Sequence, residues 1–289
     1  MTISKNKIDN LIDDFLKRKD SITFDPKHLT KFKNGNKDDE LYLSFFEGKD
    51  GGEYYLKFLK HIIKECRPKT VIELGNREGL STLAIYEALK ELPQFAGNFY
   101  TIDIIKDQRY CPDQMFTDRS THFLFGDVCS IDILEKIPFD IDFLFSDTIH
   151  YNFQIQDEFE IYQHFLSDTA LIAVDDIHLN DKGIFFEGVT YDKWDLTKIC
   201  HSSGWGLFLY KRKKPEPEDE RYKKAVRVAL TIWERKYNDK KIELDTLQKE
   251  KYISMIKSLL KKNKKFYKLY TSVYNNYLHK IKTRLVKKW

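Results

Sequence analysis

The stretch Thr70-Val-Ile-Glu-Leu-Gly-Asn-Arg-Glu-Gly-Leu-Ser-Thr82 decides the fold class of this chain. Its first five residues are largely apolar and rich in β-branched side chains, which predicts a short buried strand. Gly75 and Gly79 follow, and residues 81–89 then have the apolar spacing of a helix. A strand, a glycine-containing turn and a helix in this order are typical of one unit of a parallel α/β sheet.

The same alternation continues along the chain. Short apolar segments at 99–104, 122–125, 141–145, 170–174 and 205–210 predict further strands, and residues 154–165 predict another helix. We therefore predict an α/β fold with a Rossmann-like, doubly wound and mostly parallel sheet that has helices on both faces. Helical spacing over residues 6–18 and 54–63 predicts an N-terminal helical cap and a helix that leads into the first strand.

Composition excludes several classes of protein. The chain has 289 residues, of which 42% are hydrophobic and 15% aromatic, so it can build a sizeable core. No uncharged apolar run approaches the ~18 residues of a membrane span, and the polar, acidic N-terminus does not resemble a secretory signal. Four cysteines without a C-x-x-C pair are typical of reduced thiols, which favours a cytoplasmic location.

The small net charge of +4 conceals a division of the chain. Residues 214–289 contain 22 Lys and Arg against 9 Asp and Glu, and no acid follows Lys251. The charged segment 211–220, with two prolines at Pro215 and Pro217, spans the start of this region and is typical of a linker. We therefore predict a helical and irregular cap over 1–53, a central domain over 54–213 and a basic helical extension over 214–289.

Polar residues follow five successive predicted strands, and the carboxyl ends of parallel strands meet at one edge of a sheet, where ligands bind. After the first strand, a G-x-x-x-G loop lets the backbone approach a ligand and exposes helix N–H groups; its spacing differs from the dinucleotide fingerprint and from a phosphate loop. Asp103 can accept hydrogen bonds from ribose hydroxyls, and Asp127 can accept one from an adenine amino group. A cap or turn is the alternative role for each. The remaining groups are Asp147 with His150, and Asp175-Asp176 with His178.

Over residues 54–212 this pattern resembles the class I S-adenosylmethionine-dependent methyltransferases, whose first motif is similar to Val71-Ile-Glu-Leu-Gly-Asn-Arg-Glu-Gly-Leu-Ser-Thr-Leu-Ala84. The resemblance implies that the cofactor is S-adenosyl-L-methionine and that Asp103 holds its ribose while Asp127 lies beside its adenine. It also implies a set of residues along the methionine part: Glu73, Gly75, Asn76, Gly79 and Ser81.

The segments Ile141-Asp-Phe-Leu-Phe-Ser-Asp-Thr-Ile-His-Tyr151 and Leu171-Ile-Ala-Val-Asp-Asp-Ile-His178 look like those of the catechol and macrolide-sugar O-methyltransferases. That resemblance implies that Asp147, Asp175 and Asp176 bind Mg²⁺ or another divalent cation. Asp176 departs from it, because the catechol enzymes usually have an amide there. Capping carboxylates without a metal are the alternative. Either histidine, His150 before His178, can serve as the acid–base group, whereas we assign no role to His122, His164 or His201.

These residues predict metal-assisted O-methylation of a hydroxyl on a small polyhydroxylated acceptor such as a sugar, a glycan or a secondary metabolite. The alternatives are an RNA or protein methyltransferase that uses the basic tail, and a non-catalytic binding or scaffold protein of the same fold. The tail suits an anionic membrane surface or a lipid-linked substrate better than nucleic acid, and packing on a second subunit is open. We also expect the aromatic residues of 181–201 to shape the acceptor pocket.

Overall fold

A computed structural model describes residues 3–24, 52–93, 97–106 and 110–261 of the chain. The chain has two compact units, Met1–Ile232 and Trp233–Trp289. The predicted irregular segment 38–51 and the tail beyond residue 261 lie outside the described residues. The candidate site belongs entirely to the first unit.

The described part of the first unit contains one seven-stranded sheet, in the order β3-β2-β1-β4-β5-β7-β6. The five strands β1 to β5 are mutually parallel, and β7 and β6 add to the β5 edge in antiparallel orientation. Their bounds are Thr70–Leu74 (β1), Asn98–Asp103 (β2), Thr121–Phe125 (β3), Ile141–Ser146 (β4), Leu166–Asp175 (β5), Asp192–Asp195 (β6) and Trp205–Lys211 (β7). The predicted mostly parallel, doubly wound sheet is confirmed.

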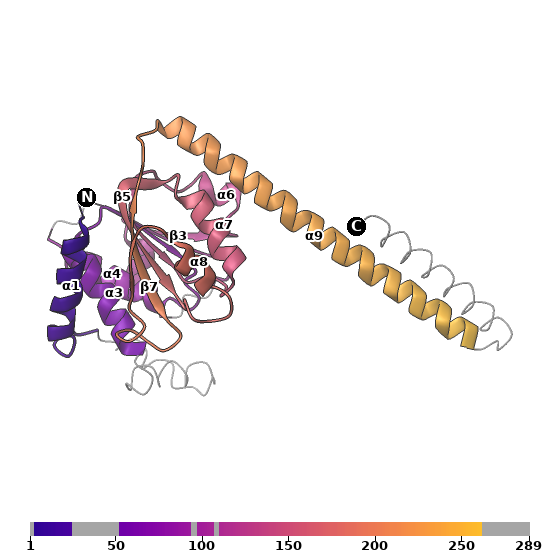
Figure 1. Ribbon diagram of the computed structural model, residues 1–289, viewed down its shortest axis with the longest axis horizontal. Coiled ribbons are helices and arrows are strands. Elements are labelled where there is room, and N and C mark those ends of the chain that lie inside the picture. The colour runs from indigo at the N-terminus through magenta and orange to yellow at the C-terminus, as the bar shows by residue number, and fades with distance from the viewer. Residues whose placement is uncertain (1–2, 25–51, 94–96, 107–109, 262–289) are drawn as a thin grey trace. The chain divides into compact units, whose positions relative to one another are not determined.

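Helices cover both faces of the sheet (Figure 1). One face carries α1 (Lys5–Arg18), α3 (Gly52–Cys66) and α4 (Leu80–Lys90). The other carries α6 (Ile131–Leu134), α7 (Asn152–Tyr162) and α8 (Gly183–Gly188), and a short helix α5 (Asp113–Thr117) precedes β3. The polypeptide then leaves the sheet and forms α9 (Glu218–Lys261), whose first turns belong to this unit.

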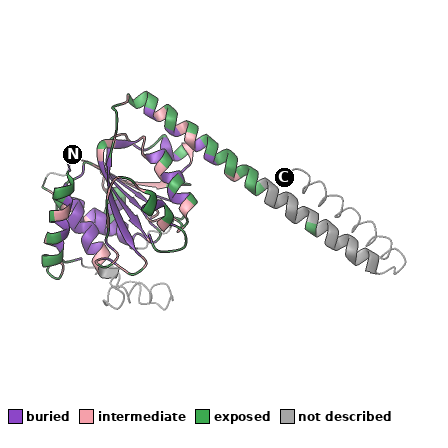
Figure 2. Cartoon of the chain, viewed as in Figure 1, coloured by how far each residue is buried: buried purple, intermediate pink, exposed green. Residues whose placement is uncertain are grey.

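Two apolar cores lie on opposite faces of the sheet, because successive strand side chains point to opposite sides. Val71 of β1 packs in the core with α1, α3 and α4, whereas its neighbour Ile72 packs in the core with α6, α7 and α8. In β4, Phe143 packs in the first of these cores and Leu144 in the second. Figure 2 shows the strands buried along most of their length, which explains their near-continuous apolar sequence.

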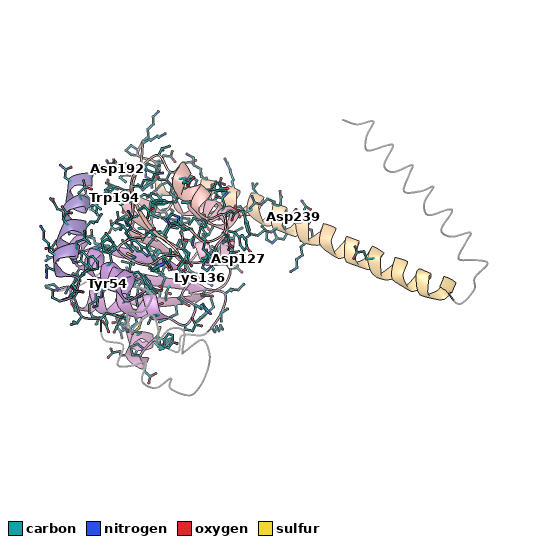
Figure 3. The ribbon with its side chains drawn as sticks, turned by 60° about the horizontal axis from the view of Figure 1, so that its bottom comes forward. Tyr54, Asp127, Lys136, Asp192, Trp194 and Asp239 are labelled. Carbon is teal, nitrogen blue, oxygen red and sulfur yellow. The ribbon has the colours of Figure 1, made fainter. Side chains whose placement is uncertain are left out.

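The N-terminal helix α1 forms as predicted and docks on α3. Its Ser4 cap accepts a hydrogen bond from the Lys7 amide at 3.3 Å, and the Phe15 ring meets the edge of Phe58 at 5.0 Å. Trp194 of β6 donates its indole N–H to Asp9 at 2.7 Å, so it lies against α1 (Figure 3). The first helix is therefore tied both to its neighbour in sequence and to the far edge of the sheet.

The segment 181–201 differs from its prediction. Phe185 and Phe186 of α8 are buried and pack in the core beside Phe208, and Tyr191 stacks on the same ring at 6.2 Å. These aromatic side chains therefore fill the space between α8 and the sheet, and the expectation that they form an acceptor pocket is wrong for the two phenylalanines. Strand β6 (Asp192–Asp195) was not predicted from the sequence, because its four residues show no strand pattern.

The first unit extends beyond the boundary predicted after residue 213, because the first turns of α9 are anchored. Arg221 is almost fully buried and donates hydrogen bonds to the Leu166 carbonyl and the Asp140 carboxylate, each at 3.1 Å. Three further buried residues follow it on the same helix: Ala225, Ala229 and Ile232. In the second unit, Trp233 and Tyr237 stack at 5.4 Å and are mainly exposed.

Among the described helices, none combines the length and the apolar character that crossing a bilayer requires.

Candidate functional site

The glycine loop between β1 and α4 has backbone angles that only glycine adopts easily. Gly75 and Gly79 have φ values of +83° and +92°, in the left-handed region. A Cβ on Gly75 would lie 2.2 Å from the Asp147 backbone oxygen, so the loops after β1 and β4 are in direct contact. Gly79 caps α4 without a side-chain hydrogen bond, which leaves the first N–H groups of that helix free of a side-chain acceptor.

Glu73 lies beneath this loop and is fully buried. Its carboxylate accepts hydrogen bonds from Ser81 and Thr82, each at 2.6 Å, and from Thr101 at 2.7 Å. Burial raises the pKa of Glu73 to about 7, although the three hydroxyls oppose that change. The predicted cofactor residues Glu73 and Ser81 therefore bind each other and brace the loop from within.

Asn76 has one side-chain atom without a partner. Its amide nitrogen donates to Thr101 at 2.8 Å, whereas its carbonyl oxygen is buried and has no hydrogen-bond partner among the described residues. Such an orphaned acceptor in a loop is costly unless a ligand or water satisfies it.

Asp103, at the end of β2, holds the loop in place. One carboxylate oxygen accepts the Asn76 and Arg77 amides at 2.8 and 2.7 Å, and the other accepts the Ile105 amide at 2.8 Å. A carboxylate offers about four lone-pair positions, so capacity for a further donor remains. The Gly126 amide donates to the Asp103 carbonyl at 2.9 Å, which brings Asp127 next to this strand end.

Asp127 accepts the Cys129 amide at 2.9 Å within a tight turn and is exposed. Asp127 therefore has the turn role that was the alternative to a contact with adenine. A carboxylate offers about four lone-pair positions, so this turn bond by itself does not exclude the predicted role beside an adenine.

The predicted acidic residues meet at the ends of β4 and β5. Asp147, His150 and Asp176 each offer a ligand atom, and these atoms lie within 4.8 Å of one another. His150 Nε2 is 3.0 Å from Asp176 and 3.8 Å from Asp147. The Asp147 amide donates to the Leu74 carbonyl at 2.8 Å, which joins this cluster to the glycine loop.

Crowding of these carboxylates changes their proton affinities. Hydrogen bonds to Asp147 and then Asp176 raise the pKa of His150 to about 9. Burial, and then the nearby charge of Asp147, raises the pKa of Asp175 to about 7. Burial would also raise the pKa of Asp176, but hydrogen bonds from His150 and Ser203 outweigh it and lower that pKa.

His201 is a member of the site that the sequence did not indicate. Its Nε2 lies 2.7 Å from Asp175, its Nδ1 lies 3.0 Å from the Ser203 hydroxyl, and its ring is largely buried. Asp175, Asp176 and His201 form a second group with metal-ligand spacing. The antiparallel pairing of Asp175 with Trp205 brings the segment before β7 back beside these carboxylates.

His178, the second predicted acid–base residue, faces a different partner. Its Nε2 lies 3.4 Å from Asp195 of β6, and about half of its side chain is exposed. It belongs to neither of the two groups with metal-ligand spacing. The geometry therefore favours His150 over His178 as the group that acts beside the carboxylates.

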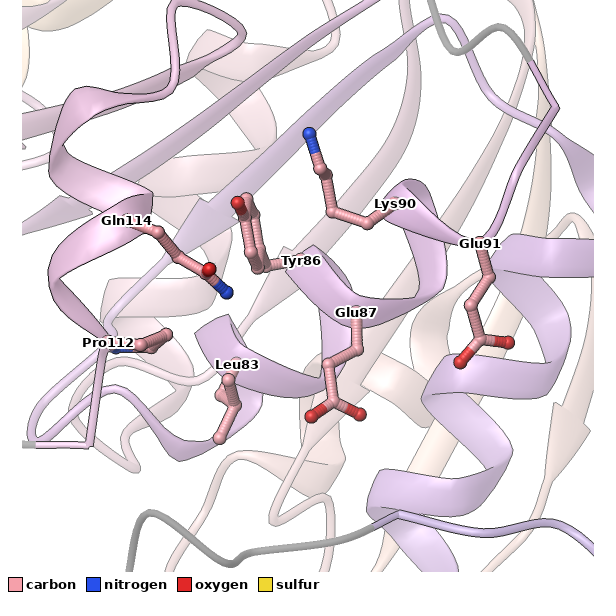
Figure 4. A pocket seen from close by; sticks show the side chains of 7 residues that line it. All are labelled: Leu83, Tyr86, Glu87, Lys90, Glu91, Pro112 and Gln114. Carbon is pink, nitrogen blue, oxygen red and sulfur yellow. The ribbon is translucent and has the colours of Figure 1, made fainter.

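A separate shallow pocket lies between α4 and the start of α5 (Figure 4). Its lining residues are Leu83, Tyr86, Glu87, Lys90, Glu91, Pro112 and Gln114. None of the predicted site residues lines this pocket, so it is not the site described above.

Comparisons with known proteins agree with this geometry. Residues 72–177, which extend from β1 to just past β5, match a family model described as a methyltransferase domain. The chain is 27% identical over 148 residues to the O-methyltransferase hkm8 of Aspergillus hancockii; the match covers 50% of this chain and 51% of that protein. The chain thus spans about half the length of this curated relative.

Two solved structures are also similar. One is the S-adenosylhomocysteine-bound methyltransferase PaMTH1 of Podospora anserina, with 15% identity, a TM-score of 0.50 and coverage of 74% of this chain and 98% of that one. The other is the O-methyltransferase TomG of Streptomyces achromogenes, with 17% identity, a TM-score of 0.48 and coverage of 69% and 96%. At such identities, the likeness to PaMTH1 supports the fold alone.

Proposed function

We propose that this chain, a class I S-adenosylmethionine-dependent methyltransferase by its fold and domain match, transfers the methyl group of that cofactor to a hydroxyl oxygen. One observation carries the proposal: the glycine loop, Asp103 and the Asp147 cluster lie at the same sheet edge, where the strand order reverses between β1 and β4. The name of the relative hkm8 supports oxygen as the methyl acceptor.

The residues of the loop fit S-adenosylmethionine. The Asn76 oxygen is an orphaned acceptor suited to the cofactor's ammonium group, and the uncapped start of α4 suits its carboxylate. Asp103 has lone-pair capacity for a ribose hydroxyl, and Asp127, just after the end of β3, would lie beside the adenine. The cofactor supplies an activated methyl group, and these residues would hold it in one orientation.

The donor set at the ends of β4 and β5 fits a hard divalent cation. Asp147 and Asp176 share one group with metal-ligand spacing with His150, and Asp175 and Asp176 share a second with His201. Carboxylate oxygens at neighbouring strand ends are the ligands that such a cation prefers. When bound, the cation would lower the pKa of an acceptor hydroxyl and, by competing with the imidazolium for the same carboxylates, that of His150. His150 would take the proton of the acceptor hydroxyl as its oxygen bonds to the methyl carbon. The bond from that carbon to the cofactor sulfur would break, and the cofactor would leave as a neutral thioether.

The proposal also covers the methyl acceptor and the surface that the basic segment binds. We take the acceptor to be a small polyhydroxylated molecule, because several hydroxyls can share a cation held by three carboxylates. The basic segment from Lys251, with 12 Lys and Arg and no acid, would hold an anionic membrane surface or a lipid-linked acceptor by attraction of opposite charges.

Calorimetry and activity assays test these statements separately. S-adenosylmethionine should bind the wild-type chain, and no binding at millimolar cofactor would refute the enzyme proposal. Asp147→Ala should remove the activation of turnover by Mg²⁺, while Asp132→Ala, on the exposed surface of α6, should leave it unchanged. Turnover that resists both chelator and Asp147→Ala would remove the metal from the mechanism.

A further inference from the structure

A buried carboxylate on α7 takes no part in the proposed chemistry. Glu158 is 1% exposed and accepts hydrogen bonds from the hydroxyl of Ser146 at 2.7 Å, from the hydroxyl of Thr148 at 2.5 Å and from the amide of Gln154 at 2.8 Å. Both hydroxyl donors belong to the residues on either side of Asp147. The carboxylate of Glu158 therefore binds the residues before and after Asp147, a proposed metal ligand.

A buried carboxylate is an unfavourable choice for a contact that serves stability alone. Burial of a carboxylate is unfavourable unless hydrogen bonds and opposite charge offset it, and an apolar side chain of similar volume often stabilises a fold equally well. Three donors satisfy Glu158, and all three come from α7 itself or from the end of β4. The bonds therefore act on the position of one loop.

A buried lysine adds a link to the neighbouring loop. Lys182 is fully buried immediately before α8, and its ammonium group has no hydrogen-bond partner among the described residues. Its positive charge favours the ionised form of Glu158 and lowers the pKa of that carboxyl, against the stronger effect of burial. Asp176 lies on the same loop as Lys182, between β5 and α8. The opposite charges of Glu158 and Lys182 therefore attract α7, which binds the residues on either side of Asp147, to the loop that carries Asp176.

We propose that Glu158 is a positioning residue that holds Asp147, through Ser146 and Thr148, in the orientation required for cation binding. This inference rests on the proposed function. Glu158 acts on Asp147 indirectly, through the hydroxyls of Ser146 and Thr148. In Glu158→Gln, the amide nitrogen replaces one acceptor oxygen, so Ser146 or Thr148 loses its acceptor. The Asp147 loop should then sample other positions, and the cation should bind more weakly.

The test compares Glu158→Gln with Glu160→Gln, an equal substitution at an exposed position of the same helix. Mn²⁺ binding is measured by electron paramagnetic resonance, and S-adenosylmethionine binding by calorimetry. We expect the Kd for Mn²⁺ to rise about 10- to 100-fold in Glu158→Gln, as is typical when a group that orients a metal ligand is lost. The Kd for the cofactor should change less than about twofold, and the Glu160 variant should match the wild type on both counts.

A contact with only a structural role would lower the melting temperature of Glu158→Gln and leave its Kd for Mn²⁺ unchanged, and that result would overturn the inference. If the variant fails to fold, Thr148→Val removes one of the same hydrogen bonds, and an unchanged Mn²⁺ affinity there has the same meaning. A wild-type chain that binds the cofactor but not Mn²⁺ would instead refute the metal proposal, and this inference with it.

Discussion

The sharpest prediction concerns Gly75, because two independent features forbid a larger residue there. Its φ of +83° would cost alanine roughly 1–2 kcal/mol. The added Cβ would also lie 2.2 Å from the Asp147 oxygen and 2.7 Å from its carbonyl carbon, and neither backbone atom can rotate away. Separation of the two loops should cost a further ~1–3 kcal/mol, as is typical of overpacking. We therefore expect Gly75→Ala to lower the free energy of unfolding by about 2–5 kcal/mol.

Urea denaturation followed by circular dichroism measures this change, and Gly188→Ala is the matched control. A Cβ on Gly188 meets nothing within 4 Å, and its φ lies outside the left-handed region, so this variant should stay within about 0.5 kcal/mol of the wild type or exceed it slightly. Gly75→Ala should also weaken Mn²⁺ binding, because separation of the loops displaces Asp147. A Gly75 variant as stable as the Gly188 variant would show that the loops after β1 and β4 are not in contact.

Three further outcomes follow from the site and from the end of the first unit. The pKa of Glu73 is raised to about 7 in the folded chain, so the contribution of its protonated form to stability is complete below the unfolded pKa of 4.5 and is lost as pH rises through 7. The loss is on the order of 3 kcal/mol. Glu73→Gln should abolish it, and urea titrations at pH 5 and pH 8 measure the difference. In the chelator-treated chain, Asp147→Asn should lower the pKa of His150 from about 9 toward its ordinary value, and an unchanged NMR titration would contradict their pairing. Truncation after Ile232 should preserve the cooperative unfolding of the first unit, whereas truncation after residue 213 should weaken it, because the buried start of α9 is lost.

Several parts of the fold could be read from the sequence because they depend on neighbours along the chain. Strand segments, the helix after Gly79 and the turn at Gly75 follow from local apolar patterns and from backbone angles that few residues adopt. The meeting of Asp103, Asp147 and Asp175 at one edge also follows, since parallel strands connected by helices bring their carboxyl ends together.

The choice of partners within the site was decided by tertiary structure. Nothing near His201 in sequence indicates that it lies 2.7 Å from Asp175, because that contact depends on the return of β7 beside β5. The hydrogen bond from Ser81 to Glu73 could not be read from the sequence either, and the proposed role of Glu158 rests on the packing of α7 against β4. A sequence pattern determines which residues end a strand, whereas side-chain contacts depend on register, rotamers and burial between segments far apart in the chain.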